Sequence, residues 1–546
     1  MKKLILIGCI LSVITGCKKD FLDTRPQAAI SSSIIWSSDD YATMAVNGIY
    51  GNFLGERYFG DYTWRYSLWG PDALDYGGST MEQGRMTAST RDIWRKYAYM
   101  YGLIRLCNDA IANITDNPKL TPEVAQRLVG ETKFIRGFCY FNLWASFGGL
   151  ILIDKPTPIQ ETYTLTRSSS EETQQFLIKD FTDAIAALPV DYSTSPSNTG
   201  RATKGAAQAM LGKTYLYAEN WAKAAEELEK LMHPPYSYGL PADYASVFDP
   251  DNERNSEIIW DMECIDYPGL GSEQDFRYGG RSLPVSGWSQ TVASWAVVNT
   301  YTNQDGSAID ISDMPKRENY ASEYDYGLVL IPWYQQKYKN ADKRLHDNII
   351  MPGDTILGNG NLQYMMKWPY GDHANDNPYP AYQLDNSDKA SFGWRKFTMD
   401  AAHGHVNRED SPLNLIFIRF ADVLLQWAEA KNEASGPSSD IYDAVNMIRD
   451  RGHVPHISGL SKDDLRKAIR MERMRELPGE GQLFFDVRRW KLAATTDLIF
   501  GLNRVENDFT MRPYFTSVFP EKYYLFPIPQ DELIFNKNLT QKPGWE

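Results

Sequence analysis

The feature that most constrains this chain is a helical pattern that combines small residues with large apolar ones. In the stretch GAAQAMLGKTYLYAENWAKAAEELEKL, Leu211, Gly212, Tyr215, Ala224 and Leu228 recur at the spacing of two consecutive helices. Small residues let antiparallel helices approach closely, and large residues fill the groove between neighbouring helix pairs. The stretch therefore predicts a helix pair that needs further pairs beside it.

Two other stretches carry the same pattern. ETKFIRGFCYFNLWASFGG contains Gly137 three positions before Tyr140, and the helix that we expect to pack on it supplies Ala184. FADVLLQWAEAKNEA is followed by SDIYDAVNMIRDR, in which Ala428 and Ala444 are the small residues. These spacings are typical of tetratricopeptide repeats, which need neighbours to bury their faces. We therefore predict an all-α fold built on a tetratricopeptide-like helical-repeat scaffold.

Helical periodicity fades in residues 65–85 and 233–412, where Gly, Pro, Asn, Asp and aromatic residues crowd together. The chain is 13% aromatic, with 15 Trp and 33 Tyr. Disordered segments are poor in aromatic residues, and long ordered loops in compact proteins usually carry function. We expect the helical scaffold to display two irregular, aromatic-rich regions.

The chain begins MKKLILIGCILSVITGCKKD, with Lys2 and Lys3 ahead of a short apolar stretch that ends at Ile14. This stretch has the length of a signal-peptide core and is too short to span a bilayer. The residues before Cys17 resemble the lipobox of bacterial lipoproteins, in which the chain is cut before the cysteine and the cysteine is acylated. The alternative is an ordinary secretory signal with an incidental cysteine.

These patterns divide the chain into five expected parts. They are a signal peptide at 1–16, a lipid-anchored tether at 17–33, an N-terminal helical-repeat region at 34–232, a loop-rich ligand-binding insertion at 233–412 and a C-terminal helical region at 413–546.

The net charge limits the kinds of partner. It is −14 for the whole chain, and −14 − 2 = −16 once Lys2 and Lys3 leave with the signal. We therefore expect neither nucleic acid nor anionic lipid to drive binding. Cys107, Cys139 and Cys264 have neither zinc spacing nor a disulfide pattern, and we interpret them as small apolar fillers.

Charged clusters in the sequence have structural explanations. Glu472 and Glu476 lie four apart among arginines, which favours a buried ion network over a glycosidase carboxylate pair. His403 and His405 have metal-ligand chemistry but no diagnostic spacing. The chain carries no nucleophile motif, phosphate-binding glycine loop or dinucleotide fingerprint. We assign no catalytic residue, no metal and no cofactor.

The aromatic loops are the best candidates for a ligand surface. Sugars present apolar C–H faces to flat rings and hydroxyl edges to polar side chains. We expect about half of the loop aromatics to be core residues. The aromatic and polar residues of the two regions are Trp64, Tyr66, Trp69, Asp72, Asp75, Tyr76, Arg85, Arg281, Trp288, Trp295, Trp333, Tyr334, Trp368, Tyr370 and Tyr379.

Six stretches follow one another along the chain: KFIRGFCYFNLWASFGG, RATKGAAQAMLGKTYLY, RFADVLLQWAEA, AVNMIRDRGH, IRMERMRELPGEGQLFFDVRRW and LFPIPQDELIFNKNLTQKPGW. Together and in this order they resemble the SusD/RagB family of nutrient-binding outer-membrane lipoproteins. The sequence departs from the family pattern at Gly137, where Ala is usual, and at Gln482, where a basic residue is common.

The resemblance implies a non-catalytic protein on the outer membrane that faces the exterior. It implies capture of an oligosaccharide or polysaccharide and its delivery to a SusC-like TonB-dependent transporter. In the family, the loops before the first long helix and in the mid-chain insertion contribute to ligand capture. We therefore favour six residues as ligand contacts: Trp69, Asp72, Tyr76, Arg85, Trp288 and Trp295.

Other functions stay open at this point. The same role could serve peptides or other nutrients, or the repeats could form a tetratricopeptide-type protein-interaction module. A glycosidase is suggested only by the abundance of carboxylates and aromatic residues.

Overall fold

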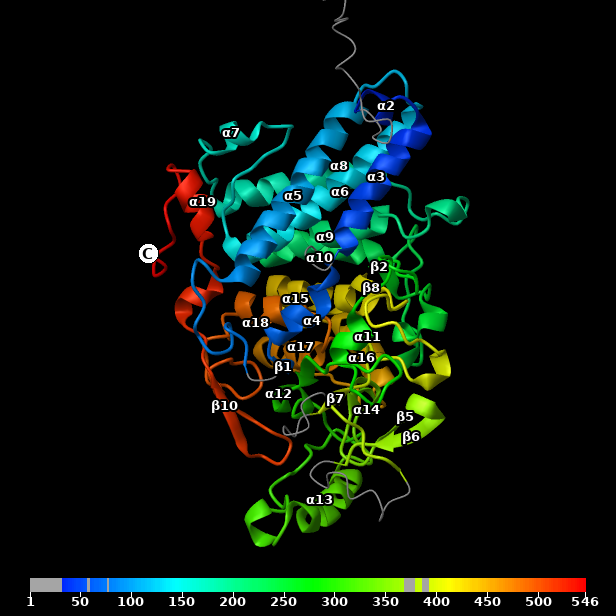
Figure 1. Ribbon diagram of the computed structural model, residues 1–546, viewed down its shortest axis with the longest axis vertical. Helices are drawn as coiled ribbons and strands as arrows, with labels where there is room; N and C mark the ends of the chain where they lie inside the picture. The colour runs from blue at the N-terminus through cyan, green and yellow to red at the C-terminus, as the bar shows by residue number, and fades with distance from the viewer. Residues whose placement is uncertain (1–31, 56–58, 76–77, 368–378, 385–391) are drawn as a thin grey trace, which may run out of the picture.

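Long helices pack on one another in the order of the sequence. The computed structural model describes residues 32–55, 59–75, 78–367, 379–384 and 392–546 (Figure 1). The longer helices are α3 (Asp39–Leu54), α5 (Arg91–Ile114), α6 (Pro122–Phe147), α8 (Ser170–Ala187), α9 (Lys204–Tyr217), α10 (Trp221–Glu229), α13 (Glu323–Lys337), α15 (Phe420–Ser435), α16 (Ser439–Arg451), α17 (Lys462–Glu476) and α18 (Gln482–Arg489). The short ones are α2 (Ser32–Ile35), α4 (Tyr62–Leu68), α7 (Ile159–Thr162), α11 (Gln274–Tyr278), α12 (Trp295–Val298), α14 (Lys343–Asn348) and α19 (Gln530–Phe535).

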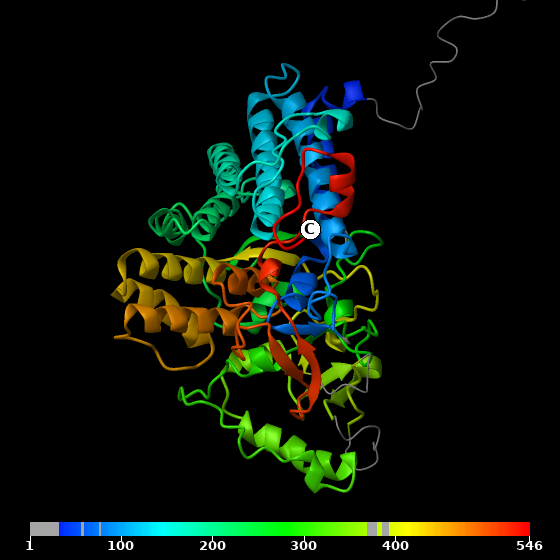
Figure 2. The ribbon, with the colours of Figure 1, turned by 90° about the vertical axis from the view of Figure 1, so that its left-hand side faces the viewer.

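The stack runs from α5 through α6, α8 and α9 to α10. Helix α10 then packs against α15, although residues 230–419 separate them in sequence, and α15 packs against α16 and α17. Figure 2 shows these helices as successive layers, with α15, α16 and α17 projecting to one side. The helical-repeat scaffold predicted from the spacing of small residues is confirmed, and the chain between α10 and α15 leaves the stack.

Two glycines show why the small residues matter. A Cβ built on Gly212 would lie 2.5 Å from Cγ of Leu228, across the α9–α10 contact. A Cβ on Gly137 would lie 2.8 Å from the ring of Phe181, across the α6–α8 contact. Real Cβ contacts are not this short, so the close approach of both helix pairs depends on glycine.

Short strands are the feature that an all-α description leaves out. Within the described residues, all sheets are two-stranded and antiparallel. The pairs are β1 (Ala73–Asp75) with β3 (Thr291–Ala293), β2 (Ile258–Met262) with β8 (Leu415–Arg419), β4 (Ile349–Ile350) with β7 (Gly393–Trp394), β5 (Thr355–Gly358) with β6 (Leu362–Met365), and β9 (Arg504–Asn507) with β10 (Pro513–Ser517). These strand pairs connect loop segments within a mostly helical protein. The boundaries of the five expected parts of the chain stay a prediction.

A cluster of aromatic rings joins the scaffold to the loop-rich part. Trp260 of β2 and Phe417 of β8 have ring centroids 5.1 Å apart. Phe138 of α6 lies 5.1 Å from Trp260, and Phe53 of α3 lies 5.4 Å from it. Because these rings come from helices and from the β2–β8 sheet, one main hydrophobic core extends through both parts.

The three cysteines within the described residues are buried, which fits their interpretation as small apolar fillers. Cys107, Cys139 and Cys264 form no disulfide, and burial raises the pKa of each thiol above its usual value. Among the helices that the structure describes, none has the length and apolar character needed to cross a bilayer.

Candidate functional site

The two aromatic-rich regions meet in one small sheet. Strand β1 from the first region pairs with β3 from the second, with Ala73 opposite Ala293 and Asp75 opposite Thr291. The Ser294 hydroxyl, next to β3, donates to the carbonyl of Pro71 at 2.6 Å. The structure thus brings together the two segments that the sequence singled out.

Three of the favoured ligand residues lie in the core beside this sheet. Trp69 is 5% exposed and packs on Phe484 and Phe526. Trp295 is 4% exposed, contacts Phe392, and donates its indole N–H to a backbone carbonyl. A ligand cannot stack on a ring that other rings already cover. The expectation that these two tryptophans contact ligand is therefore corrected.

Asp72 is also corrected, because its carboxylate serves the protein interior. It is fully buried, and its Oδ2 accepts a hydrogen bond of 2.7 Å from the backbone N–H of Gly479. Its Oδ1 has no hydrogen-bond partner among the described residues. Burial raises the pKa of this carboxyl to about 7. Asp72 thus fixes the loop before α18 and offers no surface to a sugar hydroxyl.

The remaining residues named from the sequence are either exposed or outside the described residues. Trp288 is 42% exposed, and Arg85 is exposed. Cys17 and Tyr76 lie outside the described residues. Of the six favoured ligand contacts, Trp288 is the aromatic residue that the structure places at the surface.

Trp288 is held by a compact array of aromatic and charged side chains. Its ring centroid lies 4.7 Å from that of Phe276 in α11, and its backbone N–H donates to the Phe276 carbonyl at 2.8 Å. The guanidinium of Arg277 lies 5.3 Å from the Trp288 ring and 5.0 Å from that of Trp64. Arg277 therefore lies against two indoles, Trp64 from the first region and Trp288 from the second.

Polar groups fix the orientation of Arg277. Its Nε donates to Glu273 Oε2 at 2.8 Å, and its Nη1 donates to Gln290 Oε1 at 2.7 Å. A second cation, Arg408, is exposed and lies 5.6 Å from the Phe276 ring, with Nε donating to the Val285 carbonyl. We name this set, Phe276, Arg277, Trp288, Gln290 and Arg408, the Trp288 platform.

Exposed apolar side chains lie on loops joined to α11. Tyr267 is 61% exposed and Val406 is 68% exposed. The Gly269 N–H donates to Asp410, which ties these loops together, and an isolated bridge pairs Ser272, just before α11, with Ser411. Exposed rings beside hydrogen-bonding side chains are the chemistry that a saccharide requires.

Trp288 could be selected from the sequence, but its contact with Arg277 and the contacts that hold Arg277 could not. Arg277 follows Glu273 by four positions in the sequence, a spacing that permits an ion pair on a helix. Nothing local indicates that Gln290 and Trp64 would meet the same guanidinium. Backbone hydrogen bonds between residues 276–279 and 288–289 bring Gln290 to Arg277, and the β1–β3 pairing joins the segment of Trp64 to this loop.

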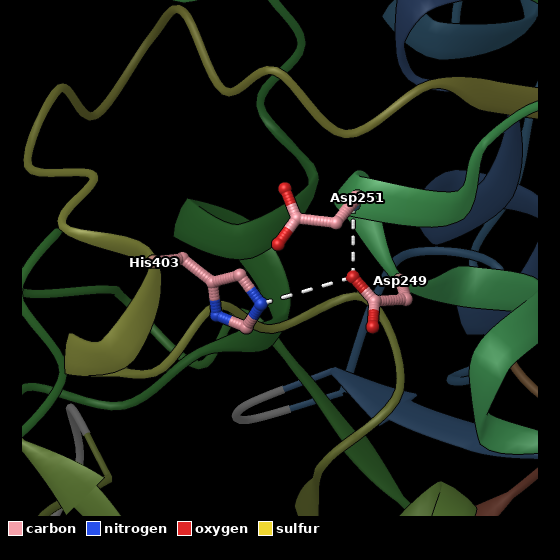
Figure 3. Close-up of side chains that lie close together, drawn as sticks. All are labelled: Asp249, Asp251 and His403. Carbon is pink, nitrogen blue, oxygen red and sulfur yellow. Dashed lines mark hydrogen bonds and ion pairs between the residues drawn. The ribbon is translucent and has the colours of Figure 1, made fainter.

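Of the two histidines, His403 belongs to an exposed cluster, whereas His405 is buried beside Asp266 and Asp275. His403 ends the short 3₁₀-helix η10 (Ala401–His403) and faces Asp249 and Asp251 at the start of another, η6 (Pro250–Asn252) (Figure 3). Asp249 already accepts the N–H of Asp251, and His403 Nδ1 lies 3.0 Å from Asp400. Each ligand atom thus has a protein partner or access to water, and we assign no metal to the cluster.

The predicted ion network around Glu472 and Glu476 is confirmed. Both carboxylates are fully buried, and both pair with Arg344. Arg419 and Arg451 also bind Glu476. Burial alone would raise the pKa of Glu476, but these arginines outweigh it and hold the pKa well below its usual range. A carboxylate held ionised in this way cannot serve as the proton donor that glycoside hydrolysis requires.

Comparison with known proteins identifies the family. The model of the SusD family matches residues 256–545, and a second family model, described as starch-binding and associating with the outer membrane, matches residues 20–216. The chain belongs to the SusD family. A SusD-like protein of Formosa agariphila, named P25, is 25% identical over 560 residues, which cover 96% of this chain and 95% of that protein.

Solved structures share the SusD fold. A SusD-like carbohydrate-binding protein from Bacteroides fragilis superposes with a TM-score of 0.77 at 23% identity, covering 93% of this chain and 100% of that one. A laminarin-binding SusD-like protein superposes with a TM-score of 0.66 at 20% identity, covering 92% and 99%. At this level of identity the likeness establishes the fold.

Proposed function

We propose that this SusD-family protein captures an oligosaccharide or polysaccharide at the Trp288 platform. The observation that carries the proposal is the exposed Trp288 ring beside Arg277, whose guanidinium is held by Glu273 and Gln290. The ring offers a flat apolar face to a pyranose, and the Arg277, Gln290 and Arg408 side chains offer polar atoms to its hydroxyls. The family-model description and the carbohydrate-binding neighbours support a glycan ligand.

We further propose that binding is not followed by catalysis. The buried carboxylates of α17 are neutralised by arginines, and the carboxylate beside the platform, Glu273, is paired with Arg277. An oxocarbenium-forming hydrolase needs a protonated and an ionised carboxyl on either side of the bond. A protein of this kind binds the glycan and releases it unchanged.

The capture role extends to delivery. We propose that Cys17 is acylated and tethers the protein to the outer membrane, facing the exterior, where it passes glycan to a SusC-like TonB-dependent transporter. A Cys17→Ala variant is expected to move from the membrane fraction to the soluble fraction. It is also expected to lose copurification with the transporter from detergent-solubilised outer membranes. Membrane retention of the variant would contradict the lipid anchor.

The test of capture is affinity electrophoresis of the soluble form that starts at Lys18. The protein runs through native gels that contain neutral or acidic polysaccharides, with bovine serum albumin as the non-binding reference. We expect retardation by at least one polysaccharide and no release of reducing ends on prolonged incubation. Equal mobility in every gel, together with binding of peptides, would overturn the glycan proposal. Release of reducing ends would overturn the non-catalytic one.

A further inference from the structure

The structure contains a cavity that shares no lining residue with the Trp288 platform. It has a volume of about 650 Å³ and is formed by the end of α6, the start of α8, α18 and the C-terminal segment, with Trp144, Phe485 and Trp545 in its wall. Pockets of 300–1,000 Å³ are the usual size for small-molecule ligands. Four of the stretches that carry the family resemblance contribute to its lining.

The lining carries an excess of positive charge, although the whole chain has a net charge of −14. Among the described residues that line it, the one acidic residue is the exposed Glu521. Arg489 is neutralised by Glu429 and Asp486. Among the described residues, no carboxylate lies within ion-pair distance of the other lining cations, which are Arg167, Arg488, Lys491, Lys522 and Lys542.

Two of these cations are buried. Arg488 is 4% exposed and Lys542 is 6% exposed. Lys542 Nζ donates to the carbonyls of Phe526 and Phe147, and Arg488 Nη2 donates to that of Tyr524 at 2.7 Å. Arg488 Nε and Nη1 have no acceptor among the described residues. Buried charges in proteins are normally paired, because their desolvation is costly.

The pKa of Lys542 reflects the lack of a counter-charge within the described residues. Burial lowers the pKa of its ammonium well below the usual value, and the positive charges of Arg167 and Arg488 lower it further. An anion in the cavity would oppose all three effects.

The start of α8 adds to the positive potential. Ser168, Ser169 and Ser170 line the cavity, and α8 runs for 18 residues from Ser170. The first turn of a helix of this length carries unpaired N–H groups and a partial positive charge, which favour bound anions. The Ser169 side chain caps one of these N–H groups, that of Glu172. Glu171 and Glu172 lie in the same turn and offset part of this charge, so Arg488 and Lys542 are the main source of positive charge in the cavity.

We propose that this cavity is a second ligand site, which takes a small molecule that carries a carboxylate, sulfate or phosphate group. The oxyanion lies near Arg488 and Lys542, and the rim cations Arg167, Lys491 and Lys522 attract it. The Trp144 and Trp545 side chains give an apolar wall for the rest of the molecule. The site uses none of the platform residues, so the proposal of oxyanion binding does not depend on glycan capture at the platform.

Isothermal titration calorimetry tests the site with three probes at constant ionic strength: glucuronate, sulfate and phosphate. Glucose and chloride are the matched non-binding controls. We expect saturable binding of at least one oxyanion and none of glucose or chloride. Tighter binding of glucuronate than of the inorganic anions assigns the site to organic acids, and the reverse order assigns it to a free oxyanion. Absence of saturable binding for all three probes would overturn the proposal.

Variants of exposed residues locate the binding. The Arg167→Gln/Lys522→Gln double variant is expected to weaken oxyanion binding by about tenfold or more, since charged hydrogen bonds are among the stronger contacts. The control double variant Lys179→Gln/Lys467→Gln removes the same charge from two exposed lysines of α8 and α17 and is expected to bind like the wild type. Equal affinity in both double variants would overturn the proposal.

A stability measurement gives a second readout. Saturating oxyanion is expected to raise the melting temperature of the wild type, and Arg488→Met is expected to lose this rise. If Arg488→Met does not fold, the Arg167→Gln/Lys522→Gln variant is used instead, and a smaller rise in its melting temperature is the expected result. Trp288→Ala is expected to bind oxyanions normally, which separates this site from the platform.

Discussion

Asp75 lies opposite Thr291 in the antiparallel β1–β3 sheet, which joins the loop after α4 to the loop after α11. The aromatic residues that flank this pairing differ in their burial. Trp69 precedes β1 and Trp295 follows β3, and both are buried. Trp288 comes three residues before β3 and is exposed.

Trp295 and Trp288 differ in burial, so their replacement by alanine is expected to affect stability differently. Trp295→Ala is expected to lower the free energy of unfolding by about 3–5 kcal/mol, because it empties a buried indole site. Trp288→Ala is expected to lower it by only about 1–2 kcal/mol, because the half-exposed ring loses its contacts with Phe276 and Arg277 but leaves no cavity in the core. Urea unfolding followed by circular dichroism measures both. Similar losses in the two variants would contradict the assignment of one ring to the core and the other to the surface.

The helix stack predicts opposite effects for two glycine substitutions. Gly212→Ala is expected to destabilise the protein by about 1–3 kcal/mol, because the added Cβ would meet Leu228 at 2.5 Å. Gly102→Ala in α5 has open space around the new Cβ and is expected to stabilise by about 0.5–1 kcal/mol through helix propensity. Melting temperatures of both variants test the pair. A stabilising Gly212→Ala would contradict the close α9–α10 contact.

The scaffold could be predicted because its information is local. Gly212 and Leu228 belong to one helix pair, and their spacing alone indicates a close contact. The ligand surface could not be predicted to the same degree. Trp69, Trp288 and Trp295 occupy similar loop sequences, and their burial depends on partners far along the chain, such as Phe484 for Trp69 and Phe392 for Trp295. No pattern within a loop reveals such partners.

The ion network predicts a large effect at a position remote from the platform. Arg419 binds Glu257, Glu476 and Glu480. Arg419→Met leaves these buried carboxylates with less positive charge and is expected to cost about 3–5 kcal/mol of unfolding free energy. The exposed pair of Arg105 with Asp109 provides the control, since Arg105→Met is expected to cost less than about 1 kcal/mol. Equal costs would show that the buried network does not stabilise the fold.

Asp72 predicts a pH dependence of stability. Burial raises its pKa from 3.8 to about 7 in the folded state. The folded state therefore holds this proton more tightly than the unfolded state, and the contribution of Asp72 to stability falls as the pH rises from 3.8 to about 7.

Asp72→Asn removes this titration and keeps an oxygen that can accept from the Gly479 N–H. Its free energy of unfolding relative to the wild type is expected to increase by about 1.4 kcal/mol per pH unit across that window and to level off above it. Urea titrations at several pH values measure the difference. A constant difference across the window would contradict the raised pKa.

The central claim is that Trp288 supplies the stacking face for a glycan, and calorimetric titration of the polysaccharide that retards the protein tests it most directly. Trp94 in α5, which is 37% exposed and packs its ring on Tyr99, provides the matched control. Trp288→Ala is expected to weaken binding by about tenfold or more, equivalent to about 1.4 kcal/mol, and Trp288→Phe is expected to restore most of the affinity. Trp94→Ala is expected to bind like the wild type. Unchanged affinity in a folded Trp288→Ala would contradict the account.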